Sequence, residues 1–179
     1  MVTVSPSSFT QVEFRIEEIL DVAAEVMGRI EAVPDDLPVE LVVDEDQPTT
    51  TMAITSLDPV VFALDSGALE DTRQPRQFGV EMASVSLASL FIEYLDRLDD
   101  SFGAPEVGEP SDLAEKIAWS AYTHGRVQRL GYRVHKPKHL YNFRNRHGFS
   151  DAADQAFDAL WDATDLTWAD ILALCPTVD

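Results

Sequence analysis

Residues 79–99 read GVEMASVSLASLFIEYLDRLD and form the most hydrophobic helix candidate in the chain. Apolar side chains such as Leu87, Phe91 and Leu95 cover most of the circumference that this segment would have as a helix. A helix that is apolar on nearly every side normally lies at the centre of a core. We therefore expect the other elements to pack around residues 79–99.

The sequence before this helix contains one further helix pattern and several strand patterns. Apolar residues recur at helical spacing over residues 10–31, which open with the capping residue Thr10. Short apolar runs at 40–44, 50–55 and 60–64 are bounded by prolines and acidic turns. Runs of this length and composition predict short strands.

The sequence after residues 79–99 has the pattern of helices. Residues 101–111 are rich in glycine, proline and acidic residues and predict a linker. Ser111 and Asp112 then cap a helix that runs to about Leu130, and Gly131 is the expected C-terminal stop.

Two more helices are expected near the C-terminus. Ser150 caps one of them, and Thr167 opens a last short helix that is closed by Pro176. Residues 131–149 are expected to be irregular, because Pro137 interrupts a continuous helix.

These patterns predict an α+β fold with a small antiparallel sheet of about three strands, about five helices and an all-helical C-terminal half. A chain of 179 residues predicts a single domain over 1–179, with a subdivision into an α+β portion at 8–100 and a helical portion at 111–179. The lone Cys175 and an N-terminus without a basic or apolar leader favour a cytoplasmic protein. No stretch is apolar over the length that a membrane span needs.

The charge of the chain is unevenly distributed. The chain carries 32 acidic and 13 basic residues, for a net charge of −19 at pH 7. No Asp or Glu occurs from Lys116 to Ser150, where eight of the 13 cations and all four histidines lie. This basic segment has a charge of +8, and the rest of the chain has −27. Such polarity points to a binding segment that the net charge conceals.

Cations alternate with aromatic residues along the basic segment. Arginine and lysine bind phosphate and carboxylate groups, and aromatic rings stack on bases. We therefore predict an anion-binding site, whose candidate residues are Trp119, Tyr122, Arg126, Arg129, Arg133, Lys136, Lys138, His139, Arg144 and Arg146. In the alternative interpretation the aromatic residues belong to the core and the cations pair with the abundant acids of the chain itself.

The histidines do not form a convincing metal motif. His135 and His139 are four residues apart, but Pro137 lies between them and no Cys or carboxylate is near in sequence. His124 lies on the apolar face of its helix, so we expect it to be buried and hydrogen-bonded. The histidines are also expected to gain charge between about pH 7 and pH 5. With no phosphate-binding glycine loop and no nucleophile motif, we predict no metal and no cofactor.

The order of elements over residues 8–100 faintly resembles that of minimal zincin-like metallopeptidases. The zinc motif of that family, two histidines and a glutamate, would lie on the helix at 79–99, which contains no histidine. We therefore do not assign the chain to the family and expect no zinc hydrolysis on this helix.

Three functions are compatible with these sequence patterns. The first is a non-enzymatic binding or regulatory protein, whose segment 116–149 engages an acidic protein partner or an anionic small molecule such as a nucleotide. The second is an enzyme acting on a phosphorylated or nucleotide substrate through Arg126, Arg129, His135 and His139. In the third, the basic segment pairs with the protein's own acidic surface or with that of a second subunit in a homo-oligomer. The charge of −27 elsewhere disfavours double-stranded nucleic acid.

Overall fold

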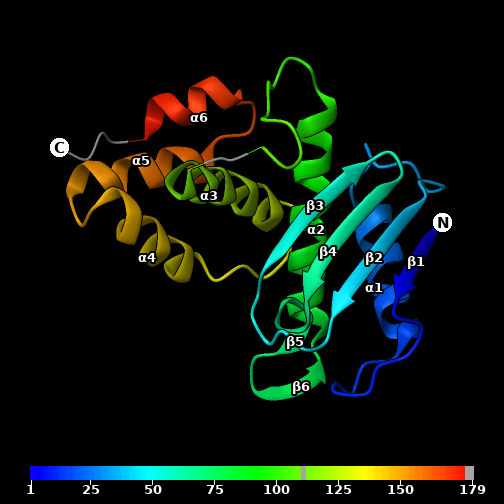
Figure 1. The fold of residues 1–179 in the computed structure, drawn as a ribbon. Coiled ribbons are helices and arrows are strands. Elements are labelled where there is room, and N and C mark those ends of the chain that lie inside the picture. The colour runs from blue at the N-terminus through cyan, green and yellow to red at the C-terminus, as the bar shows by residue number, and fades with distance from the viewer. Residues whose placement is uncertain (110–111, 176–179) are drawn as a thin grey trace. The chain divides into compact units, whose positions relative to one another are not determined.

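The computed structural model describes residues 1–109 and 112–175, which have an α+β fold (Figure 1). The chain divides into two compact units, Met1–Leu95 and Asp96–Asp179. The expected roles of Ser111 and Pro176 fall outside the described residues.

The first unit contains a mixed sheet of four strands. The strands are β1 (Val2–Ser5), β2 (Val39–Asp44), β3 (Met52–Leu57) and β4 (Val60–Asp65), in the order β1-β2-β4-β3. β1 pairs parallel with β2 and β2 pairs parallel with β4, whereas β3 is antiparallel to β4. The predicted antiparallel sheet of about three strands is therefore wrong in strand count and in most of the strand directions.

Strand direction is decided by the connections rather than by the local pattern. Helix α1 (Ile16–Arg29) carries the chain from the end of β1 back to the start of β2, which makes those neighbouring strands parallel. The strand β1 escaped prediction because its Val2–Ser5 alternation covers only four residues.

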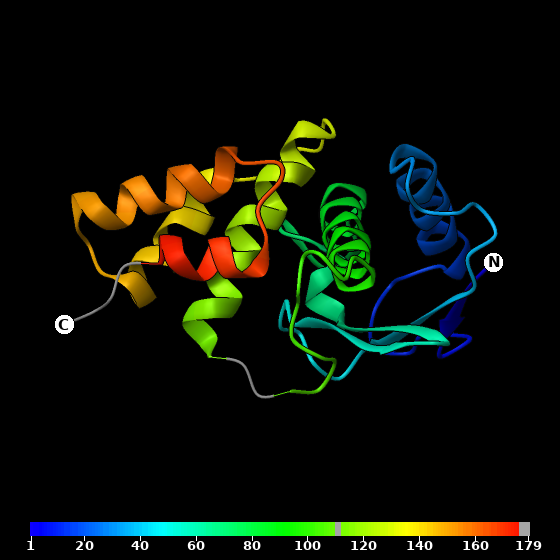
Figure 2. The ribbon, with the colours of Figure 1, turned by 90° about the horizontal axis from the view of Figure 1, so that it is seen from above.

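Two helices cover one face of this sheet (Figure 2). They are α1 and the part of α2 (Val80–Leu98) that belongs to the first unit. Alternate residues of β4 are buried, and the Phe62 ring meets that of Phe91 edge-on with the centroids 5.1 Å apart. Most apolar side chains of α2 are buried, so its expected place in the core is confirmed.

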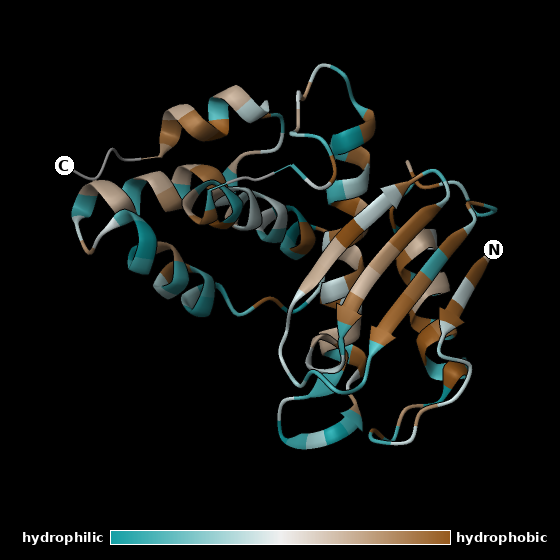
Figure 3. Ribbon diagram, in the orientation of Figure 1, coloured by the Kyte–Doolittle hydropathy of each residue, from teal (hydrophilic) through white to brown (hydrophobic). Residues whose placement is uncertain are grey.

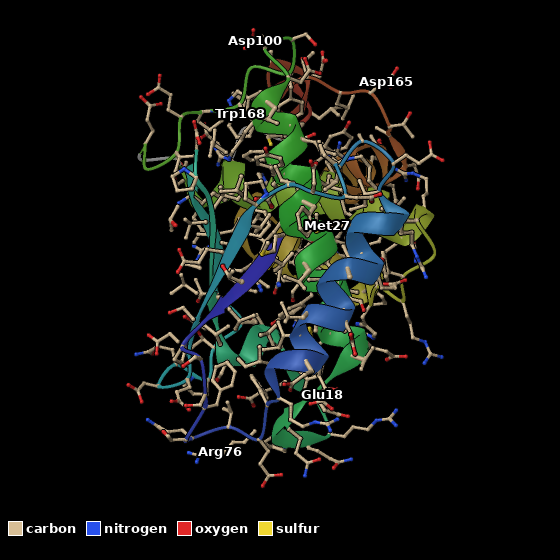
Figure 4. The ribbon with its side chains drawn as sticks, turned by 90° about the vertical axis from the view of Figure 1, so that its right-hand side faces the viewer. Glu18, Met27, Arg76, Asp100, Asp165 and Trp168 are labelled. Carbon is tan, nitrogen blue, oxygen red and sulfur yellow. The ribbon has the colours of Figure 1, made fainter. Side chains whose placement is uncertain are left out.

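Helix α1 begins later than the sequence pattern suggests. Its N-cap is Arg15 rather than Thr10. The residues before it run beside a hairpin of β5 (Glu70–Asp71) and β6 (Gln74–Phe78), where the Glu13 backbone N–H donates to the Arg76 carbonyl at 2.7 Å. This hairpin follows the 3₁₀ turn Ser66–Ala68. It was not predicted because its strands are short and polar. Figure 4 shows Glu18 near the start of α1 and Met27 near its end.

The described elements of the second unit, after the end of α2, are all helices. They are α3 (Leu113–Arg129), α4 (Lys136–His147), α5 (Asp151–Asp162) and α6 (Trp168–Leu174). The expected caps Asp112, Ser150 and Thr167 are confirmed, and each accepts a hydrogen bond from a first-turn backbone N–H. Gly131 follows α3 with a φ of 92°, as a helix stop requires.

Helix α4 corrects the expectation that residues 131–149 are irregular. Pro137 lies in the first turn of α4, where the backbone N–H has no acceptor within the helix and a proline costs nothing. The segment is nonetheless strongly hydrophilic, as its mostly teal colour in Figure 3 shows. None of the described helices combines the length and apolar character needed to cross a membrane.

Candidate basic-aromatic site

Trp119, Tyr122, Arg126 and Arg129 follow one another at helical spacing on α3, and we call them the α3 stripe. Two of them, Trp119 and Arg126, bind one buried carboxylate. Asp96 accepts a hydrogen bond from Trp119 Nε1 at 2.9 Å and another from Arg126 Nη1 at 2.8 Å. Arg126 Nη2 donates to the same carboxylate, and its Cζ lies 4.1 Å from the ring centroid of Tyr122. Bidentate pairs between ionised groups are among the strongest protein hydrogen bonds. The guanidinium of Arg126 is therefore engaged by an acid of its own chain.

The two aromatic residues of the stripe lie in the core of the helical unit. Trp119 and Tyr122 are buried, and their ring centroids lie 5.6 and 6.4 Å from that of Phe102. Trp168 meets Trp119 edge-on at 5.4 Å. The Tyr122 hydroxyl accepts a hydrogen bond from the Leu166 backbone N–H at 3.1 Å, and burial raises the pKa of this phenol. These rings have no free face on which a base could stack.

Arg129 donates hydrogen bonds to carbonyl groups at the end of a neighbouring helix. Its Nη1 donates to the Trp161 carbonyl at 2.7 Å, and its Nη2 donates to the Ala163 carbonyl. The last carbonyls of a helix have no partner within the helix, and they favour a positive charge nearby. Arg129 thus satisfies the C-terminal end of α5.

Two further cations of the candidate site pair with acids one turn apart on α5. Lys136 Nζ lies 2.8 Å from Asp158 Oδ1. Arg144 donates from Nε and Nη2 to the two oxygens of Asp154, at 2.7 and 2.5 Å. The hydrogen bonds from Arg144 hold the pKa of the Asp154 carboxyl below its usual value. Both pairs are partly exposed, so each contributes little net stability.

The two inner histidines form a neutral pair. His124 is buried and hydrogen-bonded through Nδ1 to the Ser120 carbonyl at 2.8 Å, as expected. Its ring centroid lies 4.0 Å from that of His139, which in turn lies 5.7 Å from that of Trp161. Burial lowers the pKa of His124 to about 4 and that of His139 to about 3. The expectation that they gain charge between pH 7 and pH 5 is therefore wrong.

The other histidines have local structural contacts. His147 is buried, its Nε2 lies 3.1 Å from the Ala114 carbonyl, and burial lowers its pKa. His135 is exposed and caps α4, with Nδ1 accepting from the Lys138 backbone N–H at 3.2 Å. Across residues 1–109 and 112–175, no three His, Cys, Asp or Glu side chains form a group that could hold a metal ion.

The exposed side of α4 carries cations and aromatic rings that do not pack into the helical unit. We define the α4 face as the exposed residues that follow one another at helical spacing along α4 and past its end: Lys138, Tyr141, Asn142, Asn145, Arg146 and Phe149. Tyr141 is 59% and Phe149 67% exposed, yet their rings meet edge-on at 6.1 Å. Gly148, with a φ of 93°, turns the chain after α4 ahead of Phe149.

The α4 face carries unpaired positive charge. Among the described residues, neither Lys138 nor Arg146 makes an ion pair, and no acid occurs within α4. Arg133, the remaining candidate, is exposed in the connection between α3 and α4 and makes contacts of its own.

Four residues of the α4 face were absent from the predicted site: Tyr141, Asn142, Asn145 and Phe149. The available signal was their spacing with Lys138 and Arg146, which is that of one helix face. The expectation that Pro137 excludes a helix here conceals this spacing.

Comparisons with protein families, with curated proteins and with solved structures found no match to this chain.

Proposed function

We propose that the protein is a non-enzymatic binding protein that engages an acidic protein partner through the α4 face. One observation carries this proposal. Two exposed aromatic rings, Tyr141 and Phe149, lie together beside the unpaired cations Lys138 and Arg146. Aromatic residues and arginine are enriched at the energetic centres of protein interfaces.

The basic segment then has two roles. Its inner cations, Arg126, Arg129, Lys136 and Arg144, bind acids or carbonyls within the helical unit. Its outer cations keep their charge available for a partner. In this proposal, pairing with the protein's own groups accounts for the inner set, and binding to a partner is assigned to the outer set.

A protein partner fits better than a nucleic acid. Binding to a phosphate backbone is driven by many cations at once, and its strength falls steeply with salt. The α4 face offers few cations, and the chain outside residues 116–150 carries −27. A short acidic segment with apolar residues for the two rings would meet local positive charge without long-range repulsion.

The enzymatic alternative has weaker support. It needs an imidazole that changes charge near neutral pH beside a second titratable group. His139 instead lies against His124 with its pKa near 3, and Arg126 and Arg129 are engaged within the unit.

The test uses a labelled amphipathic peptide of glutamate and leucine, titrated with the full chain and followed by fluorescence anisotropy. We expect binding that weakens as salt is raised. Arg146→Glu should weaken it by about tenfold or more, which corresponds to about 1.4 kcal/mol. Arg73→Glu makes the same charge change at an exposed position of the β5–β6 turn and should have little effect.

Three outcomes would contradict the proposal. The peptide fails to bind, or the two variants weaken its binding equally. In the third outcome, labelled single-stranded RNA binds more tightly than the peptide and loses affinity with Arg146→Glu, which would assign the α4 face to nucleic acid.

A further inference from the structure

The sheet of the first unit ends in an edge strand with unpaired backbone groups. β3 pairs with β4 on one side and is the last strand of the sheet on the other (Figure 1). The side chains of Thr51, Ala53 and Thr55 are exposed there. A row of free N–H and C=O groups on an edge is a template for a further strand.

The backbone direction identifies which groups are free. The Asp65 N–H donates to the Thr51 carbonyl at 2.9 Å, so the backbone groups of Thr51 face β4. Successive residues of an antiparallel ladder present their backbone groups alternately to the partner strand and away from it. Those of Ala53 therefore also face β4, whereas those of Met52 and Ile54 point outward. Outside the ladder itself, neither Met52 nor Ile54 makes a backbone hydrogen bond to another described residue.

Of the usual protections against pairing, β3 has a β-bulge between Ile54 and Ser56 but neither a charged residue nor a proline. Exposed edges are normally blunted by charged side chains, by proline, by bulges or by short length. No charged residue occurs from Gln47 to Leu57, although a quarter of the whole chain is charged. The strand appears in brown and near-white tones in Figure 3. The opposite edge, β1, has only four residues and is followed by Pro6.

We propose that β3 pairs with β3 of a second copy of the chain, antiparallel about a two-fold axis at Ala53. In this register Met52 lies opposite Ile54 of the second copy, and each such pair exchanges both N–H···O=C bonds. The outward groups are symmetric about Ala53, so the edge is complementary to itself. Closed two-fold pairing is the commonest form of protein oligomer.

The charges around β3 fit this register. It places Asp58 opposite Pro48 of the second copy, so no acid of the paired segments lies directly opposite another acid.

The bulge between Ile54 and Ser56 limits the straight part of the ladder, so the association is weak and depends on concentration. Because each copy carries −19, salt strengthens the pairing by screening repulsion. Salt would instead weaken an association made through the cations of the α4 face.

The experiment is sedimentation velocity of the full chain at increasing concentration, in low and high salt. We expect the dimer fraction of the unaltered protein to rise with both. Ala53→Lys and Ala53→Glu each place two like charges face to face, so each variant alone should remain monomeric. An equimolar mixture of the two should dimerise again, because Lys then lies opposite Glu.

Two controls separate pairing from folding and from net charge. Thr3→Lys makes the same charge change on β1 and should leave the dimer intact. Met52→Pro removes one outward N–H without touching the ladder to β4 and should also give a monomer with an unchanged melting temperature. The proposal is overturned if the unaltered protein is monomeric throughout. It is equally overturned if Thr3→Lys and Ala53→Lys affect association alike, or if the Lys and Glu variants fail to rescue each other.

Discussion

Asp96 is the residue that two members of the α3 stripe bind. Its carboxylate takes hydrogen bonds from Trp119 and Arg126 while it is itself buried. A buried ion pair brings little net stability over an apolar pair of the same size, but removing one partner leaves an uncompensated charge. The stability of the second unit should therefore depend strongly on the side chain at position 96. The spacing of residues in the sequence does not reveal this dependence.

Replacing Asp96 by Asn tests this dependence. We expect the free energy of unfolding to fall by about 3 kcal/mol, because Arg126 keeps its charge and loses the compensating anion. Urea unfolding followed by tryptophan fluorescence measures the change. Asp100→Asn alters the exposed residue four positions later and should stay within about 0.5 kcal/mol of the unaltered protein. Equal effects of the two changes would refute the role of Asp96.

The histidine pair predicts a loss of stability in acid. The pKa values of His124 and His139 fall from 6.5 to about 4 and about 3 on folding, so the unfolded chain binds more protons. Their contribution to stability is complete above pH 6.5 and is lost as the pH falls towards 4. For His124 alone this amounts to about 3 kcal/mol at pH 4.

The measurement is the free energy of unfolding between pH 7 and pH 4. His139→Phe keeps a ring against Trp161 and should reduce the slope of stability against pH. An unaltered slope in His139→Phe would show that carboxylates alone cause the acid sensitivity.

At the scale of elements, helices with clear end signals were predictable. The caps Asp112, Ser150 and Thr167 were identified from residue type and spacing, because a cap depends on neighbours within one turn. The irregular structure predicted around Pro137 was wrong because the effect of a proline depends on where the helix begins. A proline breaks the interior of a helix but is tolerated in its first turn. The exposed face of α4 was missed with it.

The packing of α3 on α5 depends on a glycine. A Cβ atom added at Gly125 would lie 2.0 Å from the Trp161 carbonyl oxygen, which belongs to the backbone of α5 and cannot move alone. We therefore expect Gly125→Ala to destabilise the helical unit by about 3 kcal/mol, measured by thermal unfolding.

The matched control for this change is Gly28→Ala in α1. Beyond its chain neighbours and the backbone of α1 itself, no described atom lies within 4 Å of a Cβ at that position, so the substitution should stabilise by up to about 1 kcal/mol through helix propensity. If Gly125→Ala also stabilises, the close approach of α3 and α5 is not as described.

At the scale of the whole molecule, the uneven charge has two distinct consequences. The inner cations of the basic segment pair with acids of their own unit, and we propose that the outer cations Lys138 and Arg146 bind a partner. The β3 edge, in contrast, carries no charge although the chain is strongly acidic. Two copies of this edge therefore do not repel each other locally. Salt therefore separates the two proposed surfaces: it weakens binding at the α4 face and strengthens pairing at β3.

The sequence by itself determined the α+β character, the central helix α2, the helix caps and the position of the acid-free segment. These properties depend on composition and on neighbours along the chain. Only the tertiary structure decided the strand directions and which of the cations pair with described acids of the chain. Both depend on which distant residues meet: Arg126 is occupied because the fold brings Asp96 to it, thirty residues earlier in the chain.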